Sequence, residues 1–384
     1  MGMTNRPRVA IAHDYLTQRG GAERVVLALS RAFPEAPIYT TIYDPEGTFP
    51  DFADREIVTS PLSRIPALRH DHRRALPLLA PVSSRLRVDA DVTVASSSGW
   101  AHGFATTGRT LVYCHNPARW LYQADEYLGD AGRRSPTRLA LGVLTTPLRR
   151  WDRRAAARAD RYLANSGVVR ERVARAYGIE ADVVPPPPGL DSSGPQEAHP
   201  ELAAWADRPF WLVVSRLLPY KNVDVALEAF RGRPGERLVV VGAGPERDRL
   251  VAAAPDNVRI VSGVSDAELR WIYAHAGGLV APSFEDFGLT PLEANAWGVP
   301  VVALRAGGYL DTVVEGRSGV FFDEPTPAAV GAALDRAQQH TWSEGALRRH
   351  ADGFGEVGFA ARIRAEVDAL LEGRDVSSPG PAAS

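Results

Sequence analysis

The chain has 384 residues, which is long for a single hydrophobic core and fits two domains of about 150–200 residues each. Its content of 45% hydrophobic and 23% charged residues is typical of a globular protein, and no apolar run approaches the roughly 20 residues that span a bilayer. The single cysteine, Cys114, excludes an internal disulfide. The first residues contain no long apolar stretch with a small-residue cleavage site, so we expect no secretory signal and a cytoplasmic protein.

The net charge of −2 hides two halves of opposite sign. Residues 1–190 carry 26 Arg and 19 acidic residues, whereas residues 191–384 carry 18 basic and 27 acidic residues. The positive charge is concentrated in two patches, one with Arg64, Arg69, Arg73, Arg74, Arg85 and Arg87, and one with Arg133, Arg149, Arg150, Arg153, Arg154, Arg158 and Arg161. Such patches indicate solvated helix faces, or attraction to anionic lipid headgroups or a phosphorylated lipid acceptor. No nucleic-acid-binding motif accompanies them, so we expect no nucleic-acid partner.

Short apolar runs alternate with helical patterns along the whole chain, which predicts parallel α/β sheets. The expected strands are 9–12, 92–95, 110–113, 161–164, 210–214, 238–241, 258–261, 278–281 and 299–303, and the expected helices are 22–32, 168–177, 223–230, 266–276, 326–338 and 358–371. Four consecutive prolines, 185–188, cannot continue a helix or a central strand and predict a stiff hinge. We therefore expect one domain over 1–187, a second over 188–355, and a disordered tail over 373–384 that is rich in Ser, Pro, Ala and Gly.

The loop after the predicted strand 278–281 carries the most informative motif. Open α/β sheets bind ligands at the carboxyl ends of their strands, and a helix that starts there offers free backbone N–H groups to a diphosphate. Thr290 is the expected N-cap of that helix, with Pro291 at its first position, and Glu293 closes a capping box. Glu293 fits either this structural role or a hydrogen bond to the ribose hydroxyls of a nucleotide. Glu285 has no structural role of that kind, so we expect it near a sugar ring, with an ordinary exposed loop acid as the alternative. The donor-binding residues expected from this loop are Glu285, Phe287, Gly288, Leu289, Thr290 and Glu293.

The loop after the predicted strand 210–214 carries two cations, Arg216 and Lys221. Lys221 is the only lysine among 44 basic residues, which suggests that a compact ammonium is needed there, with chance survival on a surface loop as the alternative. Fixed cations stabilise the charge that develops on a departing nucleoside diphosphate. They can replace a metal ion, and no Asp-x-Asp pair stands at a predicted strand end. We therefore predict a site that is independent of metal.

Three further candidates are weaker. Gly20 and Gly21 would let the backbone approach a ligand closely, although helix entry alone explains paired glycines. His115 follows a strand and is either structural, a contact for a donor sugar hydroxyl, or a group that moves a proton. Val264 follows another strand, where its backbone could pack on a nucleobase. The 242–246 turn lacks the third glycine of a dinucleotide-binding fingerprint, so we interpret it as a tight turn between a strand and a helix.

Together these motifs resemble glycosyltransferase family 4, retaining enzymes of the GT-B fold, from about residue 8 to residue 370. Glu285 and Glu293 match that family's paired glutamates, and Arg216 with Lys221 matches its phosphate-binding cations. The glycine turns at 241–245 and 307–308 match as well. The segments 13–16, 20–24 and 113–117 are similar to those of bacterial polysaccharide mannosyltransferases. Two departures, Asp311 where Glu is usual and Trp297 where a small residue is usual, could alter packing or base choice.

The resemblance implies two Rossmann-like domains that face each other across a cleft, with a final helix over 356–372 packing back on the N-terminal, acceptor-side domain. It implies His115, Arg216, Lys221 and Glu285 as catalytic residues and Gly20, Gly21 and Val264 among the donor contacts. It also implies transfer of a hexose with retention, from GDP-mannose to a glycan or lipid-linked acceptor, with no cofactor beyond the nucleotide-sugar substrate. The alternatives are a UDP-sugar donor, a phosphorylase or nucleotide-sugar hydrolase on the same fold, and a non-catalytic scaffold of polysaccharide assembly at a membrane.

Overall fold

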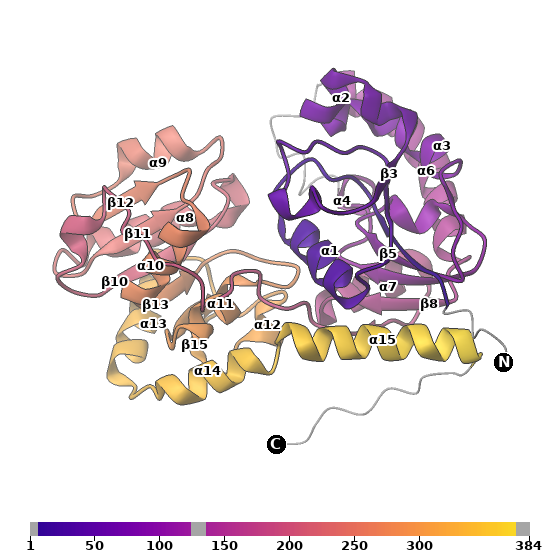
Figure 1. Cartoon of the computed structure of the whole chain (residues 1–384). Coiled ribbons are helices and arrows are strands. Elements are labelled where there is room, and N and C mark those ends of the chain that lie inside the picture. The colour runs from indigo at the N-terminus through magenta and orange to yellow at the C-terminus, as the bar shows by residue number, and fades with distance from the viewer. Residues whose placement is uncertain (1–6, 124–135, 374–384) are drawn as a thin grey trace. The chain divides into compact units, whose positions relative to one another are not determined.

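The computed structural model describes residues 7–123 and 136–373, and side chains throughout except at residues 73, 77 and 136–143 (Figure 1). The tail predicted over 373–384 lies, beyond its first residue, outside the described residues, as does Arg133 of the second arginine patch. The chain divides into two compact units. Unit 1 runs to Pro186 and resumes at Glu356, and unit 2 is Pro187–Gly355. Among the described residues, no helix is both long enough and apolar enough to cross a membrane.

Unit 1 is built on a parallel sheet of seven strands in the order β3-β2-β1-β5-β7-β8-β9. These strands are β1 (Val9–His13), β2 (Ile38–Thr40), β3 (Ile57–Thr59), β5 (Val92–Ser97), β7 (Arg109–Cys114), β8 (Arg161–Ala164) and β9 (Asp182–Val183). Its helices are α1 (Gly21–Ala32), α2 (Pro66–His70), α3 (Leu76–Ser83), α4 (Arg119–Tyr122), α6 (Pro136–Ala156), α7 (Gly167–Tyr177) and α15 (Glu356–Glu372), and β4 (Arg87–Val88) pairs with β6 (Ala105–Thr106). The strand order reverses direction between β1 and β5.

Alternate residues of the central strands fill two cores, one on each face of the unit 1 sheet. Ile11 and Tyr113 pack with α1 and α15 on one face. Ala12 and Cys114 pack with α7 on the other. The long C-terminal helix α15 therefore belongs to the core of unit 1, beside α1, β5 and β7 (Figure 1). Its buried Glu366 forms an ion pair with Arg161 on β8, which fixes the helix to the sheet as a charge pair as well as by apolar packing.

Unit 2 contains a parallel sheet of six strands in the order β12-β11-β10-β13-β14-β15. Its strands are β10 (Phe210–Val214), β11 (Leu238–Val241), β12 (Val258–Val261), β13 (Ala276–Ala281), β14 (Val301–Leu304) and β15 (Gly319–Phe322). Its helices are α8 (Val223–Arg231), α9 (Arg247–Ala253), α10 (Asp266–His275), α11 (Thr290–Ala296), α12 (Tyr309–Thr312), α13 (Pro327–Gln339) and α14 (Glu344–Asp352). This is the doubly wound order of the Rossmann fold, with the reversal between β10 and β13.

The two faces of the unit 2 sheet carry different helices. Trp211 and Val213 of β10 pack with α8 and α13. Phe210 and Leu212 of the same strand pack with α10, α11 and α12. Because β10 leads into α8 and β13 leads into α11, the chain leaves these neighbouring strands toward opposite faces. The edge where the two loops separate is the binding edge of such a sheet.

The predicted α/β architecture is confirmed. The expected strands 161–164, 210–214, 238–241 and 258–261 match the structure residue for residue. The strands β2, β3 and β9 were missed, because runs of two or three residues are too short to show a periodicity. The edge strand β15 was missed as well, although it is as long as β11 and β12. The arginine-rich helix α6 was missed as an element and was noted only for its charge.

Candidate active site

Two loops meet where the unit 2 sheet reverses its strand order. One loop follows β10 and the other follows β13. The side-chain amide of Asn222 in the first loop donates a hydrogen bond to the carbonyl of Pro282 in the second, at 3.0 Å. Lys221 Nζ lies 2.5 Å from Glu285 Oε1, so a charged pair joins the same two loops. The structure therefore brings together two of the predicted site residues that stand 64 positions apart.

The turn that carries Lys221 aims its ammonium inward. Residues Pro219–Lys221 form a short 3-10 turn, and Asn222 follows with a φ of 52°, the only positive φ among the described residues other than glycine. Asparagine tolerates this left-handed conformation better than most residues. Lys221 is only 5% exposed, and its Nζ also lies 5.0 Å from the centroid of the Tyr220 ring. A buried ammonium needs a partner, so the surface-loop alternative for Lys221 is wrong.

Glu285 is held as the counter-ion of Lys221. Its Oε1 also accepts a hydrogen bond of 2.6 Å from the Ser283 hydroxyl, which lies 3.2 Å from the Tyr309 hydroxyl. The prediction that Glu285 has no structural role is therefore wrong, because it balances a buried charge. Its side chain keeps 23% of its surface exposed at the carboxyl edge of the sheet. Sequence reasoning did not find Ser283 and Tyr309 as the groups that hold it.

Glycine turns let the backbone pack closely behind both loops. Gly307 has a φ of 60°, and a Cβ there would collide with the carbonyl oxygen of Glu285. The neighbouring Gly308 donates its N–H to that carbonyl at 2.8 Å. In the same way, a Cβ at Gly242 would collide with the carbonyl of Ser215. These turns hold the loops that carry Glu285 and Arg216 in place.

The other predicted residues of these loops differ in exposure. Arg216 is exposed, with one guanidinium nitrogen 3.4 Å from the Tyr220 hydroxyl. Phe287 is buried, and Leu289 is partly exposed. Gly288 has a φ of 82° and would bring a Cβ to 2.5 Å from the Tyr309 ring, so glycine is required there. Arg216 is thus the accessible cation beside the buried Lys221–Glu285 pair.

The capping box predicted at Thr290 and Glu293 is absent. The N-cap of α11 is Leu289, no side chain caps the helix, and Thr290 already lies within its first turn. The Thr290 side chain therefore stands one position too late to cap. Glu293 is 8% exposed, and its Oε2 accepts a hydrogen bond of 2.9 Å from the hydroxyl of Tyr273 on α10. The competing structural explanation for Glu293 is thus removed, and a partner that the sequence did not indicate takes its place.

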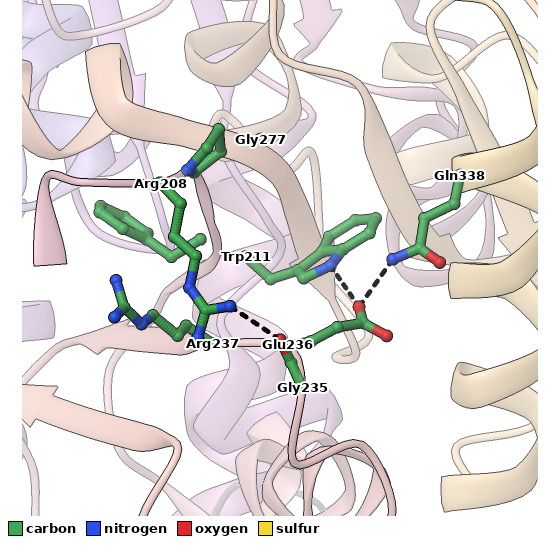
Figure 2. Close-up of a pocket in the computed structure, with 9 residues that line it drawn as sticks. Arg208, Trp211, Gly235, Glu236, Arg237, Gly277 and Gln338 are labelled. Atoms are coloured by element: carbon green, nitrogen blue, oxygen red, sulfur yellow. Dashed lines mark hydrogen bonds between the residues drawn. The ribbon is translucent and has the colours of Figure 1, made fainter.

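Two other places in unit 2 lie away from this pair. Val264 follows β12, two strands from the reversal, after Gly263 with its φ of 72°. A hollow of about 240 Å³ has Trp211, Glu236 and Arg208 among its lining residues, which Figure 2 draws as sticks. This hollow lies at the amino ends of β10, β11 and β13, the edge opposite the one where such sheets bind ligands, and no predicted site residue lines it.

In unit 1, backbone N–H groups donate hydrogen bonds at the point where the strand order reverses. Asp14, just after β1, accepts hydrogen bonds from the backbone N–H groups of Ser98, Trp100 and Ala101, at 2.6, 3.0 and 2.6 Å. Its carboxylate therefore shapes the loop that follows β5. Ser96 Oγ lies 2.7 Å from His115 Nε2 and 3.1 Å from His13 Nδ1. A buried hydroxyl thus connects the two histidines.

Gly20 is the N-cap of α1 and has an extended backbone, as helix entry requires, and Gly21 opens the helix. A Cβ at Gly20 would lie 2.5 Å from the Glu23 carboxylate. Glu23 is buried, with Oε1 3.9 Å from His13 Nε2, and its Oε2 accepts no hydrogen bond from the described residues. Gly20 therefore lies against a buried acid, Glu23, which sequence reasoning missed.

Several arginines of the second patch serve the fold. Arg149 donates to the carbonyl of Leu121, Arg153 to that of Ala176, and Arg158 to that of Gly103. These guanidinium groups satisfy backbone carbonyls. Arg149, Arg153 and Arg158 are nevertheless exposed, so the lipid contact expected for this patch stays a prediction. Arg150 and Arg154 on α6 are exposed as well.

The chain matches the models of two described protein families. Residues 19–193 match the model described as Glycosyltransferase Family 4, and residues 196–349 match the model described as Glycosyl transferases group 1. The chain belongs to glycosyltransferase family 4. Its two parallel α/β units are those of the GT-B fold, as expected from the resemblance.

Curated relatives match about half of this family 4 chain. A D-inositol 3-phosphate glycosyltransferase of Segniliparus rotundus is 33% identical over 211 residues, covering 49% of this chain and 47% of that protein. A GDP-mannose-dependent alpha-(1-6)-phosphatidylinositol monomannoside mannosyltransferase of Mycolicibacterium smegmatis is 32% identical over 192 residues, covering 44% and 50%. The chain spans about half the length of the curated relatives it matches.

Solved structures share the fold over almost the whole chain. Sucrose-phosphate synthase from Thermosynechococcus elongatus has a TM-score of 0.70 at 19% identity, covering 95% of this chain and 100% of that one. The HepE protein of Anabaena, solved in complex with UDP-glucose, has a TM-score of 0.66 at 16% identity, covering 94% and 99%. At these identities the likeness concerns the fold of the family 4 chain.

The buried His13 predicts a pH dependence of stability. Burial alone lowers the pKa of His13, but the Glu23 carboxylate, with Asp14 and the Ser96 carbonyl, outweighs it and raises the pKa above the usual 6.5. A raised pKa in the folded state adds stability that is fully present below the unfolded pKa and is lost as pH rises through the folded pKa. We expect the free energy of unfolding, measured with urea from about pH 6 to about pH 8.5, to fall with pH in the unaltered protein by more than in His13→Gln.

His70, which is exposed, provides the control for this titration. His70→Gln should keep the pH profile of the unaltered protein. Parallel profiles for the unaltered protein and His13→Gln would show that the Glu23 carboxylate does not hold a proton on His13.

Proposed function

We propose that the chain is a retaining glycosyltransferase that transfers a hexose, with GDP-mannose as donor, to a glycan or lipid-linked acceptor in polysaccharide or glycolipid biosynthesis. The observation that carries the proposal is the Lys221–Glu285 pair across the strand reversal of unit 2, with the exposed Arg216 beside it. A cation and a carboxylate at one sheet edge suit a substrate with a charged diphosphate and a neutral, hydroxyl-rich sugar. Family membership supports the same reaction class.

In the proposed reaction the bond between the sugar C1 and the diphosphate oxygen breaks, and a bond from C1 to the acceptor oxygen forms on the same face. The acceptor proton passes to the departing phosphate oxygen. Arg216 and Lys221 stabilise the negative charge that builds on the diphosphate, which lowers the transition state more than the ground state. Glu285 orients the sugar hydroxyls, and His115 of unit 1 is proposed to contact the donor sugar. Because two cations neutralise the leaving group, we propose that no divalent ion is required.

The donor-binding role is proposed for the loops that frame this pair. The backbone of residues 287–290 would receive the diphosphate, Glu293 the ribose, and Val264 the base. Gly20 and Gly21 are proposed to bring the unit 1 backbone close to the donor. GDP-mannose is preferred because of the mannosyltransferase-like N-terminal motifs, and relatives named as GDP-mannose-dependent mannosyltransferases support it. Fold neighbours solved with UDP or UDP-glucose favour the alternative, a UDP-sugar donor.

A donor panel tests the choice of substrate. Thermal shift and turnover are measured with GDP-mannose, UDP-glucose, UDP-galactose and UDP-N-acetylglucosamine, each with and without EDTA. We expect stabilisation by GDP-mannose alone and turnover that EDTA does not change. Stabilisation by UDP-sugars alone would refute the mannose donor and leave the chemistry standing. Loss of turnover in EDTA would refute metal independence, and full-rate hydrolysis without acceptor would favour a hydrolase.

Lys221→Ala tests the site itself. Loss of one preorganised charge contact should lower kcat by about 10²-fold or more. Lys221→Arg should recover only part of the activity, because the planar guanidinium does not replace a compact ammonium in a buried position. Arg317→Ala removes an exposed cation elsewhere in unit 2 and should leave kcat unchanged. Turnover of Lys221→Ala close to that of the unaltered protein would refute the role of Lys221 at the leaving group, whereas no turnover by the unaltered protein with any donor would favour the scaffold alternative.

The arginine-rich region 61–87 of unit 1 is proposed to contact an anionic membrane at the inner face of the cell membrane. Arg64 and Arg85 are exposed there, and Ile65 and Leu78 expose 45% and 48% of their surfaces, so charge and apolar groups occur together. We expect sedimentation with vesicles of phosphatidylcholine and phosphatidylglycerol to capture the protein and added salt to release it. The double variant Arg64→Glu, Arg85→Glu should abolish capture. Capture that is insensitive to salt, or no capture, would refute the contact.

A further inference from the structure

The carboxylate of Glu293 is held by a tyrosine inside the core of unit 2. Tyr273 is fully buried on α10, and its hydroxyl donates to Glu293 Oε2 at 2.9 Å. The two residues lie on different helices, α10 and α11, which pack on the same face of the sheet. A complete capping box between Ser265 and Glu268 fixes the start of α10 and therefore the direction in which Tyr273 points.

Packing alone does not explain a tyrosine at this position. A phenylalanine would fill the same space, and burying a hydroxyl is unfavourable unless it is hydrogen-bonded. The carboxylate of Glu293 is equally unfavourable inside a core, and the helix start does not use it, since Leu289 is the N-cap. The hydroxyl and the carboxylate therefore satisfy each other's hydrogen bonding. Packing requires neither group, so a function of the pair would account for both.

We infer that Tyr273 is a positioning residue that restricts the Glu293 carboxylate to the orientation in which it recognises the ribose diol of the donor nucleotide. The inference rests on the proposed function, and it adds the residue that sets selectivity for ribose over 2′-deoxyribose. A carboxylate can accept from two neighbouring hydroxyls only when its plane faces them. A hydrogen bond to one of its oxygens limits its rotation before the ligand arrives and so reduces the entropy lost on binding.

The test measures affinity for GDP and for 2′-deoxy-GDP by calorimetry. A site built to bind a hydroxyl rejects the analogue that lacks it, so the unaltered protein should prefer GDP by about 10²-fold or more. Tyr273→Phe keeps the ring in the core and should lower that preference by about tenfold, the scale of one hydrogen bond to a charged group. Its affinity for 2′-deoxy-GDP, which keeps the 3′-hydroxyl, should fall by less than its affinity for GDP. Glu293→Gln should lose most of the preference.

Unit 1 offers a matched control. The Tyr122 hydroxyl donates to the buried carboxylate of Asp152 at 2.8 Å, which is the same pair of groups away from the proposed donor residues. Tyr122→Phe should lower the thermal midpoint and keep the preference for GDP. Glu293→Asp keeps the charge but draws the carboxylate away from Tyr273, and it should lose preference as Tyr273→Phe does, which covers the case of a phenylalanine variant that folds poorly.

Two results would overturn the inference in different ways. Full preference for GDP in Tyr273→Phe, together with its loss in Glu293→Gln, would show that the Tyr273 hydroxyl serves stability only. Absence of any GDP or UDP binding by the unaltered protein would refute the proposed function and this inference with it. If UDP binds in place of GDP, the same comparison is made with UDP and 2′-deoxy-UDP, because the ribose is common to both.

Discussion

The carboxyl edge of unit 2 depends on one ion pair, Lys221 with Glu285. The loops after β10 and β13 leave neighbouring strands toward opposite faces of the sheet, so neither face can hold them together. The pair joins them, helped by the hydrogen bond from Asn222 to the Pro282 carbonyl. Lys221 is buried and the Glu285 side chain is 23% exposed, so removing Glu285 leaves a buried ammonium without its counter-ion. The proposed function assigns the diphosphate and the sugar to the same two groups, so under that proposal stability and function share an interaction.

The two units use different chemical groups to fix the loops at the reversal of their strand order. At the reversal of unit 1, the Asp14 carboxylate is satisfied by three backbone N–H groups of the next loop, which gives a fixed frame. At the reversal of unit 2, the charge of Glu285 is balanced by a side chain on a turn. A lysine with four rotatable bonds can move from one anion to another, whereas backbone N–H groups cannot. This difference supports the proposed donor site in unit 2, and it gives Asp14 a framework role.

Much of the fold followed from the sequence, and the errors have physical causes. Strands such as 210–214 and 238–241 were predicted residue for residue, since buried parallel strands are continuous apolar runs bounded by turns. The strand β15 was missed although it is as long as β11; it lies at the edge of the sheet, paired with β14. The capping box at Thr290 failed because one residue of difference in the helix start decides whether a side chain caps or lies inside the first turn.

The sequence by itself determined the family, the two α/β units and the residues with suitable chemistry, because spacing, glycine turns and a single lysine among arginines are local signals. Only the tertiary structure decided which groups meet. Lys221 pairs with Glu285 across 64 positions, and Tyr273 holds Glu293 across 20. These partners follow from the order in which strands lie in the sheet and the faces on which helices pack. That order depends on the packing of the whole core, so no single segment of the sequence determines it.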